Sequence, residues 1–277
     1  MNLKTPIVTL ISLFTLASCS TSSNKEVEAE VGQEATTINF QNKGHELVYK
    51  MIEKVGNYQK LRSKKDVVYT YTYTTPDGKA DISTEKYIFD GELSFGQYKQ
   101  HQRTLPQLEG TMTQGYDGKT YWLKINDLLI NDTTALKRVM FSRPTNFYWF
   151  SMFQKLLDPG LKYEYLGNKE MDTKSFDIVK VSFAPQNDKP TDIYHLFINK
   201  ETGIVDQFLF TVADFGVIEE PFLMQMEYEE IEGFLIPTKR KYKSSTWAAE
   251  VSDAPWILVD WSNISFDNDL KKEQFVK

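Results

Sequence analysis

Residues 67–74 read Val-Val-Tyr-Thr-Tyr-Thr-Tyr-Thr, and this alternation decides the fold class. Successive side chains of a β-strand point to opposite faces, so Tyr69, Tyr71 and Tyr73 lie together and the threonines lie opposite. The stretch therefore predicts a half-buried strand with one aromatic face. Pro76-Asp77-Gly78-Lys79 follows, and its residues are typical of a tight turn.

Similar strand patterns recur along most of the remaining chain. Turn residues such as Asp117-Gly118 and Glu232-Gly233 separate some of them. Many strands at this spacing indicate one large antiparallel meander rather than strand–helix–strand units. Because no internal repeat and no Pro/Gly/Ser-rich linker divides the region, we expect one mainly β (α+β) domain over residues 40–277. The further strands are expected at residues 84–90, 93–103, 119–125, 162–167, 176–183, 192–198, 204–212, 222–231, 234–243 and 256–266.

Helical patterns occur at the start and in the middle of this domain. Residues 45–62 fit one amphipathic helix, because apolar side chains recur along one side and charged ones face away. A short helix is expected over residues 133–141, and Pro144 opens a second one over 145–157. The second helix is apolar nearly all round, which is typical of a buried helix. Spacing leaves open whether it is a core helix or a lid over the sheet.

The first residues have the pattern of a secretion signal rather than that of a folded domain. Residues 1–18 have a positive start and an apolar run that is too short to span a membrane. Leu16-Ala17-Ser18-Cys19 resembles the lipobox of bacterial lipoproteins, which implies that Cys19 carries acyl chains and anchors the protein stably. The alternative is an ordinary signal peptide with a chance cysteine. Residues 19–39 are rich in Ser, Thr and Glu, so we expect a disordered acidic tether.

Several segments carry a family resemblance: Asn146-Phe147-Tyr148-Trp149-Phe150, Lys155-Leu156-Leu157-Asp158-Pro159-Gly160, Tyr165-Leu166-Gly167, the run 192–202, the run 205–212 and Gly233-Phe234-Leu235-Ile236-Pro237-Thr238. They resemble an uncharacterised family of bacterial lipoproteins with a fold like that of the outer-membrane lipoprotein carriers (LolA/LolB-like). The resemblance implies a strongly curved, incomplete antiparallel β-barrel with helices covering its concave face. It also implies an apolar cavity for acyl chains or other lipids. It supplies no catalytic or ligand-binding residue.

The residues themselves also favour an apolar interior. Aromatic and Met side chains gather on single faces of the expected strands, and Met suits surfaces that accept variable apolar shapes. Packed core is the alternative at each position, because inward side chains fill small barrels and line cavities only in larger or open ones. The pocket candidates are Tyr69, Tyr71, Tyr73, Phe89, Phe147, Phe150, Phe153, Phe208, Phe210, Met224 and Met226.

Composition and motifs argue against several classes of protein. A net charge of −6 gives no field for holding nucleic acid, and one cysteine allows no disulfide framework or Cys-based zinc site. His45, His101 and His195 lack metal-site spacing, and no phosphate-binding, dinucleotide-binding or hydrolase motif occurs. We therefore expect no catalytic residue, no metal and no cofactor.

These observations lead to two hypotheses of function. The first is a noncatalytic outer-membrane lipoprotein, anchored through Cys19, that binds or carries a lipid-like hydrophobic ligand. Whether it faces the periplasm or the cell surface stays open, as does any protein partner. The second is an envelope surface module that recognises carbohydrate or a partner protein through exposed Trp247, Trp256 and Trp261. A cavity favours the first, and three tryptophans on one open face favour the second.

Overall fold

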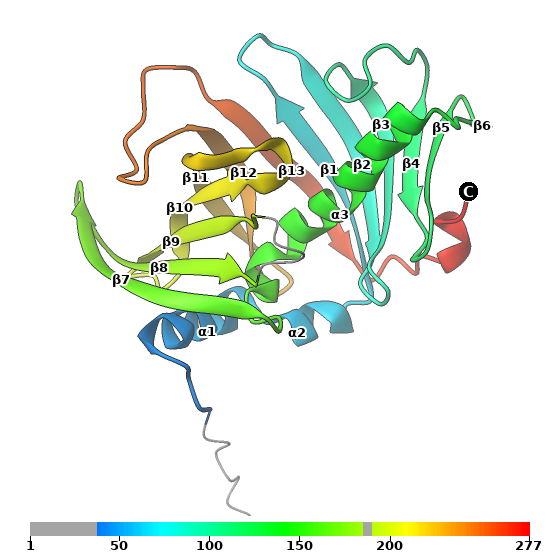
Figure 1. Ribbon diagram of the computed structural model, residues 1–277. Helices are drawn as coiled ribbons and strands as arrows, with labels where there is room; N and C mark the ends of the chain where they lie inside the picture. The colour runs from blue at the N-terminus through cyan, green and yellow to red at the C-terminus, as the bar shows by residue number, and fades with distance from the viewer. Residues whose placement is uncertain (1–37, 185–189) are drawn as a thin grey trace, which may run out of the picture. The chain divides into compact units, whose positions relative to one another are not determined.

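One antiparallel sheet dominates the part of the chain that the structure describes. The computed structural model describes residues 38–184 and 190–277, and Asn39–Lys277 form one compact unit. The sheet has 13 strands and curves around a long helix (Figure 1). The mainly β class and the curved, incomplete barrel are therefore confirmed. The expected signal peptide, Cys19 and nearly all of the tether lie outside the described residues.

Two meanders make up the sheet. The first contains β1 (Asp66–Thr74), β2 (Ala80–Ile88), β3 (Leu93–His101), β4 (Met112–Tyr116), β5 (Tyr121–Ile125) and β6 (Leu128–Leu129). The second contains β7 (Leu161–Met171), β8 (Lys174–Phe183), β9 (Ile193–Asn199), β10 (Val205–Val212), β11 (Val217–Ile231), β12 (Phe234–Ser244) and β13 (Ile257–Phe266). They join where β1 pairs with β13, so β6 and β7 become the two edges and the sheet is not closed. The patterns predicted all of these strands except β4 and β6.

The join between the meanders brings the two ends of the domain together. In the β1–β13 ladder Tyr71 lies opposite Trp261 and Tyr73 lies opposite Val259. The alternation at residues 67–74 is confirmed, since Tyr69 and Tyr73 are buried on the concave face. The aromatic face of β1 thus becomes part of the middle of the sheet.

Two helices pack at one end of the concave face: α1 (Lys43–Val55) and α2 (Tyr58–Ser63). The prediction of one helix over 45–62 is wrong, because the chain breaks at Gly56. Its φ of 95° suits glycine, and a Cβ there would lie 2.5 Å from the ring of Phe234. Asn57 then begins the second helix by accepting a hydrogen bond from the backbone N–H of Lys60 at 2.9 Å.

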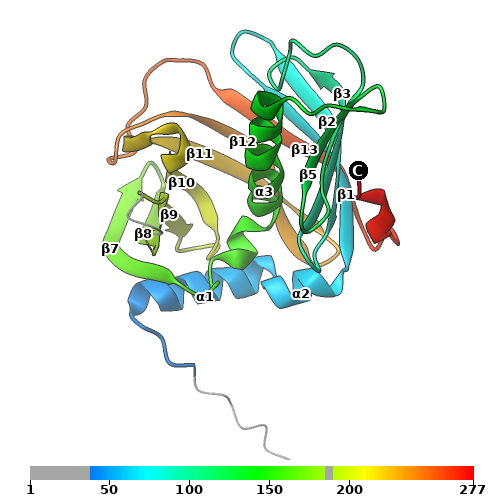
Figure 2. The same ribbon diagram turned by 45° about the vertical axis from the view of Figure 1, so that its right-hand side comes forward.

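A single long helix, α3 (Thr133–Lys155), connects the two edges of the sheet. Because β6 and β7 lie at opposite edges, this connection has to cross the concave face, as Figure 2 shows. Its 23 residues span about 35 Å. The prediction of separate helices over 133–141 and 145–157 is wrong. Pro144 lies inside α3, where buried Val139 and Phe147 on either side of it hold the helix on the sheet.

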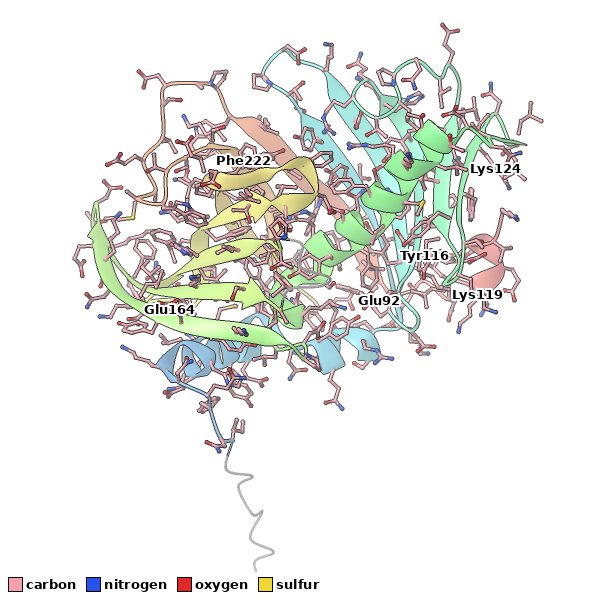
Figure 3. All side chains as sticks on the ribbon, in the orientation of Figure 1. Glu92, Tyr116, Lys119, Lys124, Glu164 and Phe222 are labelled. Carbon is pink, nitrogen blue, oxygen red and sulfur yellow. The ribbon has the colours of Figure 1, made fainter. Side chains whose placement is uncertain are left out.

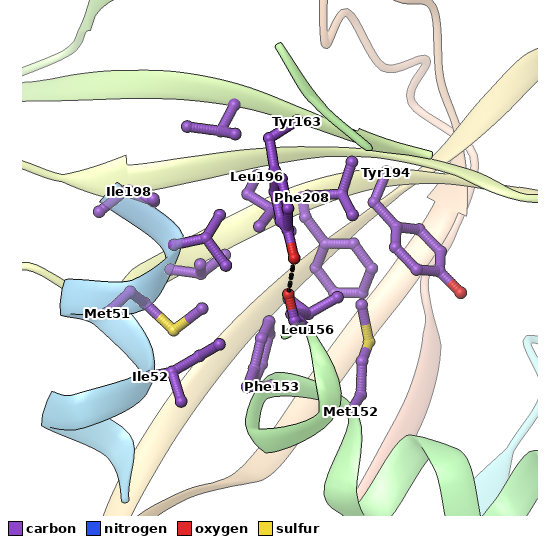
Figure 4. Packing of buried hydrophobic residues seen from close by; sticks show 14 of the residues in the cluster. Met51, Ile52, Met152, Phe153, Leu156, Tyr163, Tyr194, Leu196, Ile198 and Phe208 are labelled. Carbon is purple, nitrogen blue, oxygen red and sulfur yellow. Dashed lines mark hydrogen bonds between the residues drawn. The ribbon is translucent and has the colours of Figure 1, made fainter. Parts of the chain in front are cut away.

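The concave face is densely packed where α1 and the end of α3 meet it (Figure 4). Met51 and Ile52 of α1 and Phe153 of α3 are buried against side chains of β7 to β11. The hydroxyl of Tyr163 donates a hydrogen bond to the carbonyl oxygen of Leu156 at 2.7 Å. This contact satisfies one of the carbonyls that every helix leaves free at its C-terminus. The segment 145–157 was expected to form either a lid or a core helix. Its C-terminal end belongs to the core.

The convex face carries smaller clusters of its own. Buried side chains of β8 to β11, including Phe197 and Leu209, pack beneath Trp247 and Trp256. Two short 3₁₀ helices complete the fold: η1 (Ala213–Phe215) follows β10, and η2 (Lys272–Gln274) lies near the C-terminus. Strands β8 to β11 therefore carry packed side chains on both faces, and further clusters pack α3 on the concave face of the first meander.

Candidate functional site

A cavity of about 880 Å³ lies between the middle of α3 and the concave face of the central strands. Strands β1 and β10 to β13 supply most of its floor, and η1 lies at its mouth. Exposed Phe215 of η1 contacts Phe141 of α3 there, with 4.7 Å between the ring centroids. The volume lies in the usual range for a small-molecule site, roughly 300–1,000 Å³.

Aromatic rings form one wall of the cavity. Phe210, Phe222 and Tyr242 come from three adjacent strands, with ring centroids 5.4–5.7 Å apart. Figure 3 labels Phe222 on its strand. Trp149 reaches this wall from α3, and its ring lies 5.3 Å from that of Phe210. Edge-to-face contacts of this kind hold the rings in fixed positions, so the apolar wall is preformed.

The structure separates the sequence-predicted pocket candidates into three groups. Tyr71, Tyr73, Phe210 and Met224 line the cavity. Met226 lines a second hollow of about 750 Å³. The others are buried in packed clusters and do not line the cavity: Tyr69, Phe89, Phe147, Phe150, Phe153 and Phe208. Tyr69, for example, lies 5.0 Å from the ring of Phe150, so α3 covers it.

An arginine on the cavity floor differs from the other buried arginine of the domain. Arg240 on β12 is 5% exposed, and it makes no hydrogen bond or ion pair with any residue in 38–184 or 190–277. Its guanidinium lies 3.4 Å from the ring centre of Trp261, and burial lowers the pKa of Arg240 to about 10. Arg143, in contrast, is paired with the buried carboxylate of Glu85 at 2.8 Å. The guanidinium of Arg240 is therefore charged at neutral pH and lacks a counter-ion within the described protein.

Other charged groups lie around the cavity, and most have partners or lie at its mouth. Asp81 accepts hydrogen bonds from the guanidinium of Arg103 at 3.1 Å and from the hydroxyl of Thr104 at 2.8 Å. Asp192 accepts one from the backbone N–H of Ala213 at 2.7 Å, and burial raises the pKa of Asp192. Asp214 is exposed beside it. No ion pair links these carboxylates to the buried arginine in the described part of the chain.

Unpaired polar atoms concentrate at the same place. Six buried side-chain nitrogen or oxygen atoms among the described residues lack a hydrogen-bond partner. Three of them belong to residues that line the cavity: the hydroxyl of Tyr148, Nε of Arg240 and Nε1 of Trp261. Buried polar groups are nearly always paired, with protein, water or a ligand. The residues that line the cavity therefore include both aromatic rings and side chains with buried, unpaired nitrogen atoms, those of Arg240 and Trp261.

The tryptophans of the alternative hypothesis do not share one open face. Trp261 is buried on the concave face beneath Arg240, with 3% of its surface exposed. Trp247 and Trp256 are half-buried on the convex face, where they pack over the cluster that contains Phe197. The expected cluster of exposed tryptophans is thus contradicted by their burial.

The histidines are also dispersed. His45 stacks on Tyr163 with 4.7 Å between the rings, and His195 lies 4.5 Å from Trp247. Nε2 of His101 is 3.1 Å from the carbonyl oxygen of Gly110. No group of three His, Cys, Asp or Glu side chains that could hold a metal occurs in residues 38–184 and 190–277. Over the same residues, none of the helices is long and apolar enough to cross a membrane.

The most distinctive residue of the site was missed by the sequence reasoning. Arg240 lies in a stretch that was predicted as a strand, with alternate residues on alternate faces. Extending the period of two from Ile236 through Thr238 places Arg240 and Tyr242 on the same apolar face. That signal was available, but a charged side chain is mostly expected to face solvent.

Comparisons with solved structures find likenesses of fold. A LolA superfamily protein from Nitrosomonas europaea is 13% identical, covers 84% of this chain and 97% of its own, and has a TM-score of 0.48. The chain is similar to it in fold. A DUF1329 family protein from Desulfovibrio piger is 12% identical over 84% of this chain and 95% of its own, with a TM-score of 0.48. Lipoprotein LppX from Mycobacterium tuberculosis is 9% identical over 82% and 97%, with a TM-score of 0.34.

The identities of 9–13% and the TM-scores of 0.34–0.48 describe a likeness of overall fold and nothing beyond it. No model of a protein family matches the chain, and no curated protein matches it.

Proposed function

We propose that this protein is a bacterial envelope lipoprotein that binds a lipid-like hydrophobic ligand in the cavity beside α3. The observation that carries the proposal is the cavity of about 880 Å³ with its wall of Phe210, Phe222 and Tyr242. An apolar wall of this kind favours hydrocarbon, because burying a CH₂ group contributes about 0.8 kcal/mol. Packed clusters on both sides of the cavity hold its lining residues in place.

The anchor is the second part of the proposal. The lipobox-like sequence that ends in Cys19 supports acylation of this cysteine, and the acidic tether would then separate the domain from an outer membrane. The protein would bind or carry its ligand at that membrane without chemical conversion. Replacing Cys19 by Ser should move the protein from the membrane fraction to the soluble fraction. Retention of the variant in the outer-membrane fraction would contradict this anchor.

Ligand binding is tested with the chain that carries Cys19→Ser, so that its own acyl chains do not compete. Native mass spectrometry should show co-purified lipid, and the stripped protein should bind a fluorescent fatty acid. Asn146→Trp should reduce this binding, because Asn146 of α3 lines the cavity and the indole would occupy part of it. Lys137→Trp is the matched control, since Lys137 is exposed on the same helix and does not line the cavity.

Two outcomes would contradict the proposal, one for ligand binding itself and one for the location of the binding site. Absence of co-purified lipid together with no uptake of the fatty acid by the Cys19→Ser chain would refute ligand binding. Equal losses in the Asn146→Trp and Lys137→Trp variants would place the binding site elsewhere.

A further inference from the structure

Arg240 is a buried cation for which the described protein supplies no counter-ion. We propose that Arg240 binds the anionic head of the ligand, so that the ligand class is an aliphatic amphiphile with a terminal carboxylate or phosphate monoester. This inference rests on the proposed function and specifies the chemistry of the same cavity.

The cost of burying this charge is the first argument. An ion removed from water without a partner is strongly unfavourable, and native proteins pair such groups or use them. The domain does pair its other buried arginine: Glu85 contacts Arg143, and Ser83 and Tyr87 donate hydrogen bonds to the same carboxylate at 2.7 and 3.0 Å. Arg240 has no equivalent partner among the described residues. An anionic ligand would supply one.

The position of Arg240 on the sheet is the second argument. Its neighbours in the ladder are Met226 on β11 and Val259 on β13, so the guanidinium rises from an apolar surface. One face of the guanidinium stacks on Trp261 at 3.4 Å. Stacking occupies the face of the planar group and leaves the N–H edge free, which is the edge that binds carboxylates and phosphates with two hydrogen bonds.

The surrounding groups fit an anion next to hydrocarbon. Tyr148 and Trp261 line the same cavity, and Nε1 of Trp261 is a hydrogen-bond donor without a partner among the described residues. The carboxylates that could compete for Arg240 are engaged or distant: Asp81 pairs with Arg103, and Asp192 accepts from a backbone N–H. The rings of the Phe210 wall then provide a surface for the chain of the amphiphile.

The test compares four ligands on the full chain with Cys19→Ser. Hexadecanoate and hexadecyl phosphate carry both chain and anion, hexadecanol carries only the chain, and inorganic phosphate carries only the anion. Displacement of a fluorescent fatty acid gives their dissociation constants. We expect each anionic amphiphile to bind at least about tenfold more tightly than hexadecanol. One charge-assisted hydrogen bond contributes a difference in binding free energy of that size. Inorganic phosphate alone should not displace the fatty acid.

Arg240→Met should remove the preference for the anion and leave the affinity for hexadecanol within about twofold, since the chain keeps its apolar wall. Lys239→Met is the matched control, because Lys239 is the adjacent cation on the same strand, is exposed and does not line the cavity. Its preference for the anionic amphiphiles should equal that of the native chain. A retained preference in Arg240→Met would assign the anion to another residue and overturn the inference.

The ligand preference of the Cys19→Ser chain that keeps Arg240 decides the question even if Arg240→Met fails to fold. Equal affinities for hexadecanoate and hexadecanol would refute the anionic head while leaving lipid binding intact. Failure of all three amphiphiles to bind would refute the proposed function itself. If inorganic phosphate displaced the fatty acid as effectively as hexadecyl phosphate does, the ligand would not need an aliphatic chain. The inference that the ligand is an amphiphile would then be wrong.

Discussion

The guanidinium of Arg143 on α3 and the carboxylate of Glu85 on β2 form an enclosed ion pair, with 2.8 Å between Nη1 and Oε2 and neither side chain exposed. Burial by itself works to lower the pKa of Arg143, but the Glu85 carboxylate outweighs it and the pKa rises. Arg143 is thus charged at neutral pH. The pair fixes the middle of α3 to the first meander.

Breaking this pair should destabilise the domain strongly. Glu85→Leu leaves the Arg143 charge buried without its partner, and we expect a loss of about 3–5 kcal/mol in the free energy of unfolding. The double variant Glu85→Leu/Arg143→Met should recover much of that loss, because both charges are gone. Urea denaturation followed by circular dichroism measures both. A single variant as stable as the native chain would contradict the enclosure of the pair.

The same pair makes a glycine necessary on the neighbouring strand. A Cβ at Gly96 would lie 2.5 Å from Nη1 of Arg143 and 2.8 Å from Oε1 of Glu85. Gly96→Ala should therefore cost about 1–3 kcal/mol through overpacking. Gln97→Ala is the control, since Gln97 is the next residue of β3 and is exposed. Thermal denaturation compares the two, and similar midpoints for both variants would disprove this close approach.

Arg240 should reduce the stability of the ligand-free protein. Its pKa is lowered to about 10 by burial, from the usual 12.5, so the folded state disfavours the charge. Below about pH 10, Arg240 is charged in both the folded and the unfolded chain, so folding includes the full free-energy cost of burying the charge. This cost falls only as the pH rises above about 10. At pH 7, Arg240→Met should therefore raise the stability by roughly 1–2 kcal/mol. A lower Tm for this variant than for the native chain would contradict the prediction.

His195 should make the protein sensitive to mild acid. Burial, and then the nearby charge of Lys180, lowers the pKa of His195 from 6.5 to about 4. Between about pH 6.5 and pH 4, His195 is protonated in the unfolded chain but not in the folded chain. The free energy of unfolding therefore falls as the pH drops through this range. His195→Phe should show a smaller difference in unfolding free energy between pH 7 and pH 5, because the ring contact with Trp247 can remain. Identical pH dependence in variant and native chain would refute this role.

Local patterns predicted the sheet well because the signal for a strand is local. The alternation in residues 234–243, for example, predicted β12, which spans Phe234–Ser244. The helices were predicted less well. Pro144 suggested a helix start, but packing of the residues around it keeps α3 continuous. Gly56 breaks the first helix for a reason that lies far away in the chain, the ring of Phe234.

The sequence by itself determined the antiparallel, mainly β architecture and the presence of aromatic faces on its strands, since both follow from spacing over a few residues. Only the tertiary structure decided which aromatic face became core and which became cavity. Tyr69 and Tyr71 have the same pattern, yet Phe150 of α3 covers Tyr69 whereas Tyr71 lines the cavity. The pairing of β1 with β13 and the path of α3 set this difference, and both depend on residues far apart in the chain.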